Sequence, residues 1–369
     1  MRVLHFFKTY WPDTFGGVER TIHAIAKGVA KYGIESDVLS LSRAPDENSL
    51  AFDGHMAHKA KLDFEFASTG FSREAFGRFR ELSKKADVIH YHFPWPVMDV
   101  VHLTSRTGKP SVVTYHSDVV KQKVLLQFYK PLMLRFLADV DRIVATSPNY
   151  LESSDVLRKF RAKTTVIPLG LDETDYPSVD DAVRMRWRSR FPGRFFLFVG
   201  VLRYYKGIHI LVEAARRNGL EVVVVGSGPM EAELKQLAAK GAENVHFVGA
   251  VSDQDKVALL ELCEAFVFPS PLRSEAFGLS LVEAAMFGKP MISCEIGTGT
   301  SFVNLNDKTG MVVPSNDADA LSDAMKRLWQ DEKKAAAMGV AARDRYLAHF
   351  TAQRMCAAYH RLYDELVQR

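Results

Sequence analysis

The sequence predicts an α/β protein built from two doubly wound, Rossmann-like domains that face each other across a cleft. Short apolar runs rich in β-branched residues alternate with amphipathic helical stretches from one end of the chain to the other. Strands that alternate with helices form parallel sheets with both faces covered. At 369 residues the chain is too long for one ordinary core, so two domains of about 150–200 residues are expected.

Twelve apolar runs are predicted to form strands, six in each domain. Between the first two, the stretch VERTIHAIAKGVAKYG has the apolar spacing of a helix and ends on Gly33, a residue typical of helix C-caps. The predicted strands are 2–7, 36–42, 88–92, 111–116, 142–147 and 164–170 in the first domain, and 195–200, 221–226, 244–249, 265–270, 290–294 and 310–314 in the second.

The alternation stops once, at a polar, proline-containing stretch over 171–194. Such a composition predicts a linker with room for one short helix. We therefore expect a first domain over 1–172, a linker over 173–194 and a second domain over 195–350. The last helix, 351–369, follows the complete second domain, and the sequence leaves open whether it packs back on the first.

Composition is that of a globular protein, with 47% hydrophobic and 25% charged residues. Three cysteines, Cys263, Cys294 and Cys356, are far apart and form no CxxC pair, which argues against a disulfide framework or a zinc site and fits a reducing cytosol. The apolar run at the N-terminus is too short for a signal peptide, and no run approaches the ~18 apolar residues of a membrane span. We expect a cytoplasmic protein, free in solution or peripheral on the inner face of the cytoplasmic membrane.

The net charge of +4 is unevenly distributed. Residues 1–170 contain 24 Lys and Arg against 18 Asp and Glu, and the remainder contains 24 against 26. A basic half is compatible with an anionic membrane or a phosphorylated substrate. The excess is too small, and too poorly interleaved with aromatic residues, for nucleic-acid binding, so no nucleic-acid partner is expected.

The most informative stretch is RSEAFGLSLVEAAMFGKP, residues 273–290. It joins the predicted strand 265–270 to a helix whose first backbone amides belong to residues 277–279. Unpaired amides and the helix dipole make such an end a site for anions, and Gly278 lets a phosphate approach the backbone closely.

Two glutamates flank this predicted anion site. Glu275 precedes it, and Glu283 lies roughly 7–8 Å further along the helix. Carboxylates on both sides of a pyrophosphate suit the hydroxyls of a nucleotide sugar, and a loop charge beside a solvated helix residue is the alternative. The segment GVLRYYKG adds Arg203 and Lys206 at the end of another strand. These cations would neutralise a diphosphate leaving group, and a solvated pair of side chains is the alternative.

Taken in order, the segments GGVER, GVLRYYKG, VVVGSGP and EAFGLSLVE resemble the retaining GT-B glycosyltransferases of family 4, and the last contains the E-x7-E signature of that family. The similarity runs from Gly16 to about Pro314. It implies an acceptor-side first domain over 1–172 and a second domain over 195–350 that binds the donor, with a nucleotide sugar as donor and a saccharide as acceptor.

The resemblance also implies roles for individual residues. His116 would lie near the reacting sugar and Asp118 on the acceptor side. Arg203 and Lys206 would hold the diphosphate, and Glu275 would contact the donor sugar. The implied catalytic residues are thus His116, Arg203, Lys206 and Glu275. Residues implied to contact the donor nucleotide, its ribose or its phosphates are Gly16, Gly17, Gly226, Gly228, Val251, Phe277, Gly278, Leu279 and Glu283.

Retaining enzymes of this type are thought to expel the diphosphate on the face where the acceptor attacks, so the resemblance gives Glu275 a positioning and electrostatic role. No metal and no other cofactor is expected, because cationic side chains would neutralise the diphosphate. The Asp-x-Asp sequence at 139–141 lies at a predicted helix-to-strand junction and suits a cap or the surface. The histidines of HYH, 90–92, are expected to line the cleft, with a metal site as the alternative.

The segment KQKVLLQFYKPLMLRF, 121–136, mixes basic and apolar residues directly after the predicted acceptor side. This composition suits an anionic membrane or a polyprenyl-diphosphate-linked acceptor, and a core helix with a solvated polar face is the alternative. Its basic residues are Lys121, Lys123, Lys130 and Arg135.

Around SCEIGTGTSFVN the chain is similar to bacterial O-antigen mannosyl- and rhamnosyltransferases, which implies a GDP-mannose or GDP-deoxymannose donor and a growing polysaccharide as acceptor. Motif spacing does not distinguish guanine from uracil, so a UDP-sugar stays as the alternative. A nucleotide-sugar 2-epimerase and a non-catalytic subunit share the architecture. The E-x7-E pair beside Arg203 and Lys206 argues against the first, and the presence of His116, Lys206 and Glu275 against the second. An NAD-dependent oxidoreductase is disfavoured because GxGxxG does not follow the first strand.

Overall fold

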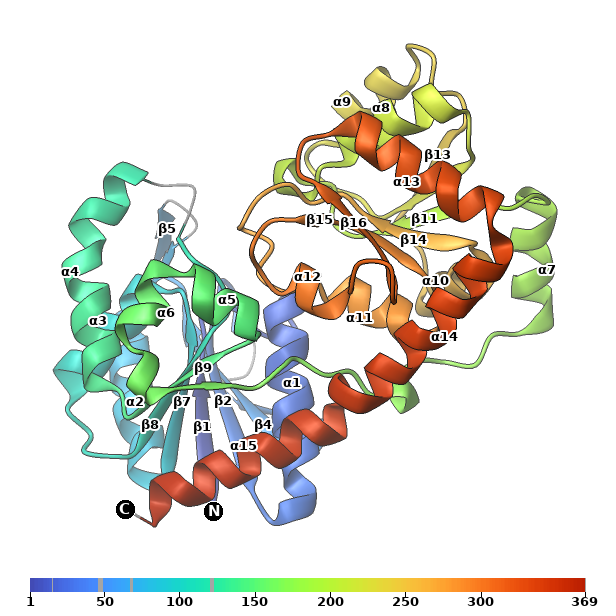
Figure 1. The fold of residues 1–369 in the computed structure, drawn as a ribbon. Coiled ribbons are helices and arrows are strands. Elements are labelled where there is room, and N and C mark those ends of the chain that lie inside the picture. The colour runs from blue at the N-terminus through green and yellow to red at the C-terminus, as the bar shows by residue number, and fades with distance from the viewer. Residues whose placement is uncertain (15, 46–48, 67–68, 120–122, 369) are drawn as a thin grey trace. The chain divides into compact units, whose positions relative to one another are not determined.

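The computed structural model describes residues 1–14, 16–45, 49–66, 69–119 and 123–368. The chain divides into two compact units (Figure 1). The first consists of Met1–Gly170 and Ala352–Arg369, and the second of Leu171–Thr351. Each unit contains a sheet covered by helices, so the prediction of two Rossmann-like α/β domains is confirmed.

The first unit contains an eight-stranded sheet in the order β10-β9-β8-β7-β1-β2-β4-β3. Neighbouring strands are parallel except at one edge, where β3 pairs with β4 in the antiparallel sense. The strands are β1 (Arg2–Phe6), β2 (Glu35–Ser42), β3 (Ser49–Phe52), β4 (His55–Lys61), β7 (Val88–Phe93), β8 (Ser111–Tyr115), β9 (Arg142–Ala145) and β10 (Thr164–Val166).

The antiparallel edge corrects the expectation of purely parallel strands. Phe52 of β3 pairs with His55 of β4 across a two-residue turn, Asp53-Gly54, with φ angles of 45° and 85°. Two positive φ angles in succession give the hairpin turn whose twist matches that of its strands, and Asp-Gly is its preferred sequence. β5 (Phe64–Phe66) and β6 (Thr69–Phe71) form a separate antiparallel pair.

Helices cover the first sheet. α1 buries Ile22, Ile25 and Val29, which share one face of the helix, and Gly33 ends the 3-10 turn after it with a left-handed φ of 73°. α15 belongs to this unit and packs along α1. The helices are α1 (Gly17–Val29), η1 (Ala30–Tyr32), α2 (Glu74–Lys85), α3 (Pro96–Ser105), α4 (Lys123–Asp139), α5 (Pro148–Ser153), α6 (Asp155–Lys159), η2 (Arg161–Lys163) and α15 (Ala352–Val367).

The second unit contains a six-stranded parallel sheet in the order β13-β12-β11-β14-β15-β16. Its strands are β11 (Phe196–Val199), β12 (Val222–Val225), β13 (Val245–Gly249), β14 (Ala265–Phe268), β15 (Met291–Glu295) and β16 (Gly310–Pro314). Its helices are η3 (Glu173–Asp175), α7 (Asp181–Arg190), η4 (Tyr204–Lys206), α8 (Ile208–Asn218), α9 (Glu231–Ala238), α10 (Asp253–Leu262), α11 (Leu279–Met286), α12 (Thr300–Val303), α13 (Ala318–Gln330) and α14 (Glu332–His349).

The segment expected to be a linker contains α7, which packs on α10 inside the second unit. Trp187 of α7 is 5% exposed, and its indole Nε1 donates a hydrogen bond of 2.7 Å to Asp255 Oδ1. A polar helix with one buried tryptophan can therefore be part of a compact unit, although its sequence has the composition of a linker.

Strand order reverses once in each sheet, between β1 and β7 in the first unit and between β11 and β14 in the second. All four of these strands run parallel to their partners, so their carboxyl ends lie at one edge of the sheet. In open α/β sheets, ligands bind in the crevice outside those carboxyl ends, at the point of reversal. The two reversal points therefore locate the regions where a site is expected.

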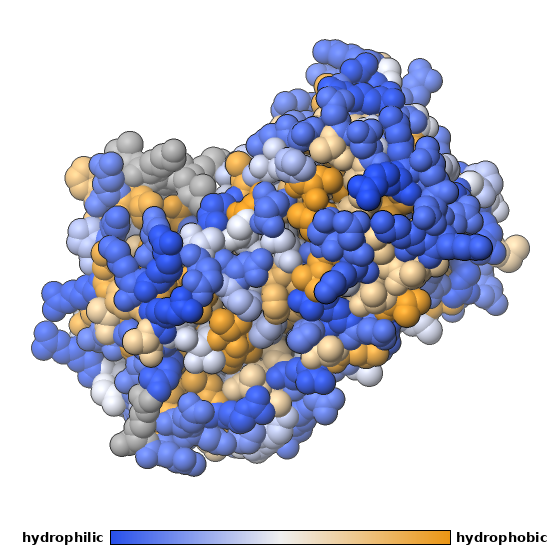
Figure 2. All heavy atoms as spheres, viewed as in Figure 1, coloured by the Kyte–Doolittle hydropathy of each residue, from blue (hydrophilic) through white to orange (hydrophobic). Residues whose placement is uncertain are grey.

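Figure 2 shows polar and charged side chains over much of α13 and α14 on the face turned to the viewer. Among the described residues, every helix is too short or too polar to cross a bilayer.

Candidate functional site

Two loops of the second unit begin side by side, because β11 and β14 are parallel neighbours with Leu197 opposite Phe266. The loop after β11 contains Arg203 and Lys206, and the loop after β14 contains Glu275. Residues about 70 positions apart in the chain are thus brought to one edge of the sheet. This edge is the donor site that was predicted from the sequence.

Lys206 and Glu275 form an ion pair, with Nζ 2.5 Å from Oε2 and side-chain exposures of 13% and 12%. Ser270 Oγ donates to the same carboxylate oxygen at 3.5 Å. The ammonium group also lies 4.9 Å from the centre of the Phe268 ring, and the face of an aromatic ring attracts a cation at this distance. The two residues were predicted separately, as a diphosphate ligand and a sugar ligand; the structure brings them into direct contact.

Arg203 differs from Lys206 in its surroundings. It caps the N-terminus of η4 and is exposed. Within the described part of the chain, its guanidinium has no acidic partner. It therefore presents an uncompensated positive charge at the carboxyl edge of β11.

Close contacts between backbones explain the glycines at this edge. Gly207 has a φ of 70°, and a Cβ there would lie 2.1 Å from the carbonyl oxygen of Pro269. A Cβ on Gly226, at φ 126°, would lie 2.0 Å from Gly200 O, and one on Gly228 would lie 2.6 Å from Leu202 O. Gly226 and Gly228 were predicted to pack against a nucleotide. Here they allow the loop after β12 to touch the loop after β11.

The start of α11 has the predicted form of an anion site. Gly278 is its N-cap, with a φ of 89° and no side-chain cap, and Leu279 is its first residue. Phe277, the residue before this N-cap, is 4% exposed. The preceding loop is held by Thr298, whose Oγ1 donates to Glu275 O at 2.8 Å, and by Gly299, whose amide donates to Ala276 O at 2.8 Å. Thr298 and Gly299 were not among the site residues predicted from the sequence.

Glu283, the second glutamate of the pair, is held on α11 by two residues that the sequence analysis missed. Lys256 Nζ of α10 lies 3.0 Å from Glu283 Oε1, and Tyr176 OH donates to the same oxygen at 2.8 Å. The Lys256 ammonium also lies 4.9 Å from the centre of the Tyr176 ring. Side-chain exposures of 11% and 12% for Lys256 and Glu283 make this a largely buried ion pair. Both of these contacts are to Oε1 of the Glu283 carboxylate.

Val251 is half-buried and precedes Ser252, the N-cap of α10. Ser252 Oγ accepts the amide of Asp255 at 3.1 Å, which fixes the loop in which Val251 lies. Val251 therefore lies in the loop between β13 and α10, and its contact with a base stays a prediction.

The remaining predicted residues lie in the first unit. Gly16 and Gly17 begin α1, and a Cβ on Gly16 would lie 3.0 Å from Oε2 of Glu19. Asp118 follows β8, and its Oδ1 accepts hydrogen bonds from Tyr115 OH at 2.9 Å and Ser154 Oγ at 2.8 Å. That carboxylate oxygen organises the turn after β8. Lys121, from the predicted membrane segment, lies outside the described residues.

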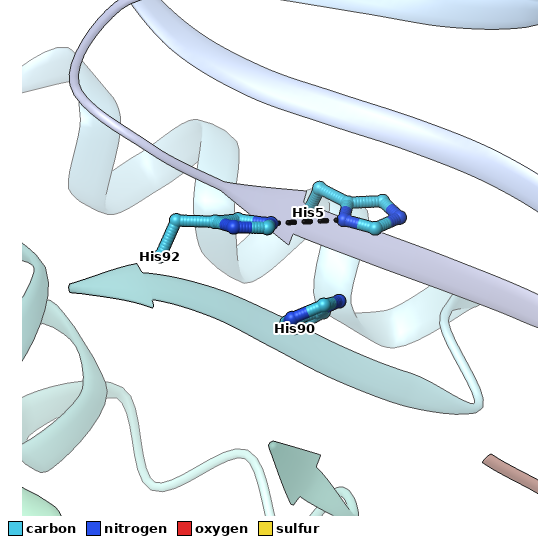
Figure 3. A group of neighbouring side chains, drawn as sticks. All are labelled: His5, His90 and His92. Carbon is cyan, nitrogen blue, oxygen red and sulfur yellow. Dashed lines mark hydrogen bonds between the residues drawn. The ribbon is translucent and has the colours of Figure 1, made fainter. Parts of the chain in front are cut away.

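A layer of histidines lies at the reversal point of the first sheet (Figure 3). His5 of β1 pairs in register with His90 of β7, and His92 pairs with Thr114 of β8, so their side chains share one face. His5 Nδ1 lies 3.1 Å from His92 Nε2, and His92 Nδ1 lies 3.0 Å from His116 Nε2. The layer therefore connects β1 to the predicted catalytic histidine.

His90 and His92 are fully buried, which corrects the expectation that they line a cleft. Both nitrogens of His90 are hydrogen-bonded, Nδ1 to Tyr363 OH and Nε2 to Thr114 Oγ1, each at 2.7 Å. Tyr363 comes from α15, so the last helix covers this layer. Burial lowers the pKa of His5 and His116 to about 3 and that of His90 and His92 well below its usual value. All four rings are neutral at pH 7.

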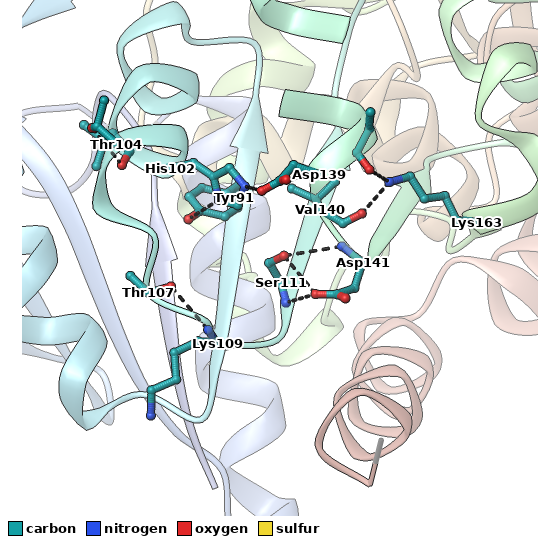
Figure 4. A network of polar contacts seen from close by, with 12 residues as sticks. Tyr91, His102, Thr104, Thr107, Lys109, Ser111, Asp139, Val140, Asp141 and Lys163 are labelled. Carbon is teal, nitrogen blue, oxygen red and sulfur yellow. Dashed lines mark hydrogen bonds and ion pairs between the residues drawn. The ribbon is translucent and has the colours of Figure 1, made fainter. Parts of the chain in front are cut away.

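The described residues contain one group of side chains that could together hold a metal ion. His5, His90 and His92 form the one cluster of three with ligand atoms within 4.8 Å of one another. The Asp-x-Asp sequence lies at the junction of α4 and β9, as predicted, and both carboxylates have protein partners (Figure 4). Asp139 Oδ2 lies 2.9 Å from His102 Nε2, and Asp141 Oδ2 accepts the amide of Ser111 at 2.8 Å.

Comparison with known proteins agrees with this geometry. The family model described as "Glycosyltransferase Family 4" matches residues 15–175, and that described as "Glycosyl transferases group 1" matches residues 183–345. The D-rhamnosyltransferase WbpZ of Pseudomonas aeruginosa is 55% identical over 353 residues, which are 95% of this chain and 93% of that protein. The O-antigen chain mannosyltransferase C of Escherichia coli is 49% identical over 369 residues, which are 100% of this chain and 99% of that protein.

Solved structures share the fold at low sequence identity. Sucrose-phosphate synthase of Thermosynechococcus elongatus has a TM-score of 0.82 and 22% identity, over 99% of this chain and 98% of that one. Anabaena HepE in complex with UDP and glucose has a TM-score of 0.80 and 16% identity, over 99% of this chain and 100% of that one.

The Lys256–Glu283 pair leads to a prediction about stability. Replacing Lys256 with Met leaves a largely buried carboxylate without its cation, so the free energy of unfolding of the second unit should fall by about 1–3 kcal/mol. Urea denaturation followed by tryptophan fluorescence measures this. Lys235→Met is the matched control, because Lys235 pairs with Glu231 on the surface and its loss should cost less than about 0.5 kcal/mol. Equal effects of the two substitutions would contradict the importance of the buried pair.

Proposed function

The chain belongs to glycosyltransferase family 4. We propose that it transfers a hexose, either mannose or a deoxymannose, from a GDP-sugar to a growing, lipid-linked polysaccharide such as O-antigen. The names of its relatives support this choice, since one is a D-rhamnosyltransferase and another an O-antigen chain mannosyltransferase. Both are transferases, which does not favour a 2-epimerase. The proposed setting is the cytoplasm, where nucleotide sugars are the donors.

The observation that carries the proposal is the meeting of two loops at the reversal between β11 and β14. Arg203, the Lys206–Glu275 pair and the N-terminus of α11 gather there. A diphosphate needs cations and amide donors, and a sugar needs a carboxylate that accepts hydrogen bonds from its hydroxyls. This edge of the sheet supplies both.

The proposed reaction retains the configuration at the anomeric carbon. The bond from that carbon to the β-phosphate oxygen breaks, a bond to the acceptor oxygen forms on the same face, and the acceptor proton passes to the departing phosphate. Arg203, Lys206 and the amides at the start of α11 stabilise the charge that develops on the diphosphate. Glu275 orients the sugar, Glu283 Oε2 accepts a ribose hydroxyl, and His116 contacts the transferred sugar. No metal is needed in this scheme, because side-chain cations neutralise the leaving group.

Donor recognition is tested by calorimetry with GDP-mannose and UDP-glucose. We expect GDP-mannose to bind, and Arg203→Ala to weaken that binding by roughly 10- to 100-fold, because a charge-assisted hydrogen bond to the diphosphate is lost. Arg188→Ala is the control, since Arg188 is an exposed arginine of α7 outside the two loops. If UDP-glucose binds and GDP-mannose does not, the donor base is uracil and not the proposed guanine. If Arg203→Ala binds the donor as tightly as wild type does, Arg203 is not part of the diphosphate site.

The retaining and metal-independent character is tested on the reaction itself. With a saccharide acceptor and an excess of chelator, turnover should equal that in magnesium, and NMR of the first product should show the anomeric configuration of the donor. Loss of turnover in chelator that returns with magnesium would contradict metal independence. An inverted product would contradict the same-face displacement.

We further propose that α4 brings the first unit to an anionic membrane carrying the lipid-linked acceptor. Phe128 on α4 is 80% exposed, and Arg135, seven residues later, is exposed on the same face of the helix. Phe64 and Phe66 of β5 are exposed by 57% and 63%. Apolar and basic side chains together suit the interface of an anionic bilayer.

Sedimentation with vesicles containing phosphatidylglycerol tests the membrane contact. Phe128→Asp should reduce the bound fraction, because it removes an apolar anchor and adds a negative charge beside anionic lipid. Met185→Asp makes the same kind of change at a side chain of α7 that is 67% exposed, and should leave binding unchanged. Wild-type binding should also weaken as salt is raised. Retention of binding by Phe128→Asp would reject α4 as the contact.

A further inference from the structure

Three imidazole rings are connected in a row through the first sheet, from His5 on β1 through His92 on β7 to His116 after β8. The two hydrogen bonds measure 3.1 Å and 3.0 Å. Adjacent rings are inclined by only 21° and 22°. His92 is the middle member and uses both of its nitrogens within the row.

A neutral imidazole has one N–H and one nitrogen lone pair. Because burial keeps these rings neutral, each donates through one nitrogen and accepts through the other. The two hydrogen bonds must then run in the same direction, since His92 cannot donate or accept at both ends. Only two arrangements satisfy the row: every proton on Nδ1, or every proton on Nε2.

The ends of the row decide between these arrangements. His5 Nε2 is buried and has no hydrogen-bond partner in the structure as described. With every proton on Nε2, a buried N–H would stay unpaired at this end, and unpaired buried N–H groups are rarer than unpaired buried acceptors. With every proton on Nδ1, the unpaired atom is an acceptor. In that arrangement the free N–H of the row is Nδ1–H of His116, a residue that keeps 8% of its surface exposed.

A metal ion explains the arrangement of these rings less well than the row of hydrogen bonds does. The candidate cluster is His5, His90 and His92. Both nitrogens of His90 already bond to Tyr363 and Thr114, and both nitrogens of His92 bond within the row. A metal would have to break bonds at two of its three ligands, whereas the row leaves them intact.

We propose that His92 and His5 are positioning residues that hold His116 in the Nδ1–H tautomer, so that His116 is a hydrogen-bond donor toward an oxygen of the transferred sugar. The part concerning the sugar rests on the proposed function. The tautomer itself follows from the row and exists in the free protein. The nearby His90 takes no part, because it bonds to other residues.

The test begins with NMR of wild-type protein labelled with ¹⁵N in its histidines, at pH 7, with signals assigned by His116→Gln and His92→Gln. Chemical shifts distinguish a protonated from an unprotonated ring nitrogen. We expect His5, His92 and His116 all to be protonated on Nδ1. An Nε2–H tautomer of His116 overturns the proposal, and no variant is needed for that result.

His92→Phe then removes both hydrogen bonds of the middle ring and keeps a flat ring in the buried layer. His116 should lose its single tautomer, and transfer of mannose should fall about tenfold in kcat with little change in KM for the donor, because one donor to the sugar is no longer fixed. His90→Phe is the matched control, on the same strand and equally buried. It should leave the tautomer of His116 unchanged. If His92→Phe does not fold, His5→Phe is used, and it should mix the tautomers.

The outcomes separate this inference from the proposed function. An unchanged His116 tautomer in both His92→Phe and His5→Phe overturns the positioning role. A wild-type protein that transfers sugar from no donor overturns the proposed function, while its spectrum still decides the tautomer. An Nδ1–H tautomer with kcat unchanged in His92→Phe overturns the contact between His116 and the sugar.

Discussion

The reversal of strand order between β11 and β14 is the constraint on which the site of the second unit depends. Parallel pairing carries both loops to one edge, so Lys206 and Glu275 meet although 69 residues separate them. Glycine makes the meeting possible. At Gly207 and Gly226 the backbones of neighbouring loops approach so closely that any Cβ would overlap a carbonyl oxygen. Charge and close packing therefore depend on one topological feature.

The first unit uses the same plan with different chemistry. Its reversal lies between β1 and β7, and the side chains there are histidines instead of the aliphatic residues usual in a buried sheet. Burying polar rings is unfavourable unless they are hydrogen-bonded. Two tyrosines of α15 supply some of these hydrogen bonds: Tyr359 bonds to Thr114, and Tyr363 bonds to His90. The return of the last helix to the first unit thus completes the polar layer as well as the core.

The sequence was sufficient for features that depend on local pattern. Apolar β-branched runs predicted the buried parallel strands, and Gly278 after such a strand predicted the start of α11. The hairpin of β3 and β4 was not predicted, although Asp53-Gly54 is a sequence typical of a two-residue hairpin turn and is visible in the local sequence. Contacts between elements were not predictable. Nothing in the sequence aligns α10 with α11, so the pairing of Lys256 with Glu283 needed coordinates, as did the burial of His90 under α15.

Arg203 and Lys206, the two predicted ligands of the diphosphate, have unequal electrostatic roles. Lys206 is neutralised by Glu275, so the pair adds almost no net charge to this edge of the sheet. The ion pair does fix the direction of the Glu275 carboxylate. Arg203 has no such partner among the described residues, and together with the partial charge at the start of α11 it makes the edge positive. A diphosphate entering this edge would be attracted mainly by Arg203 and α11. Lys206 would contribute once a phosphate oxygen competes with Glu275 for its ammonium group, which frees the carboxylate to accept sugar hydroxyls. Binding of the phosphate and orientation of the sugar are then coupled through a single ion pair.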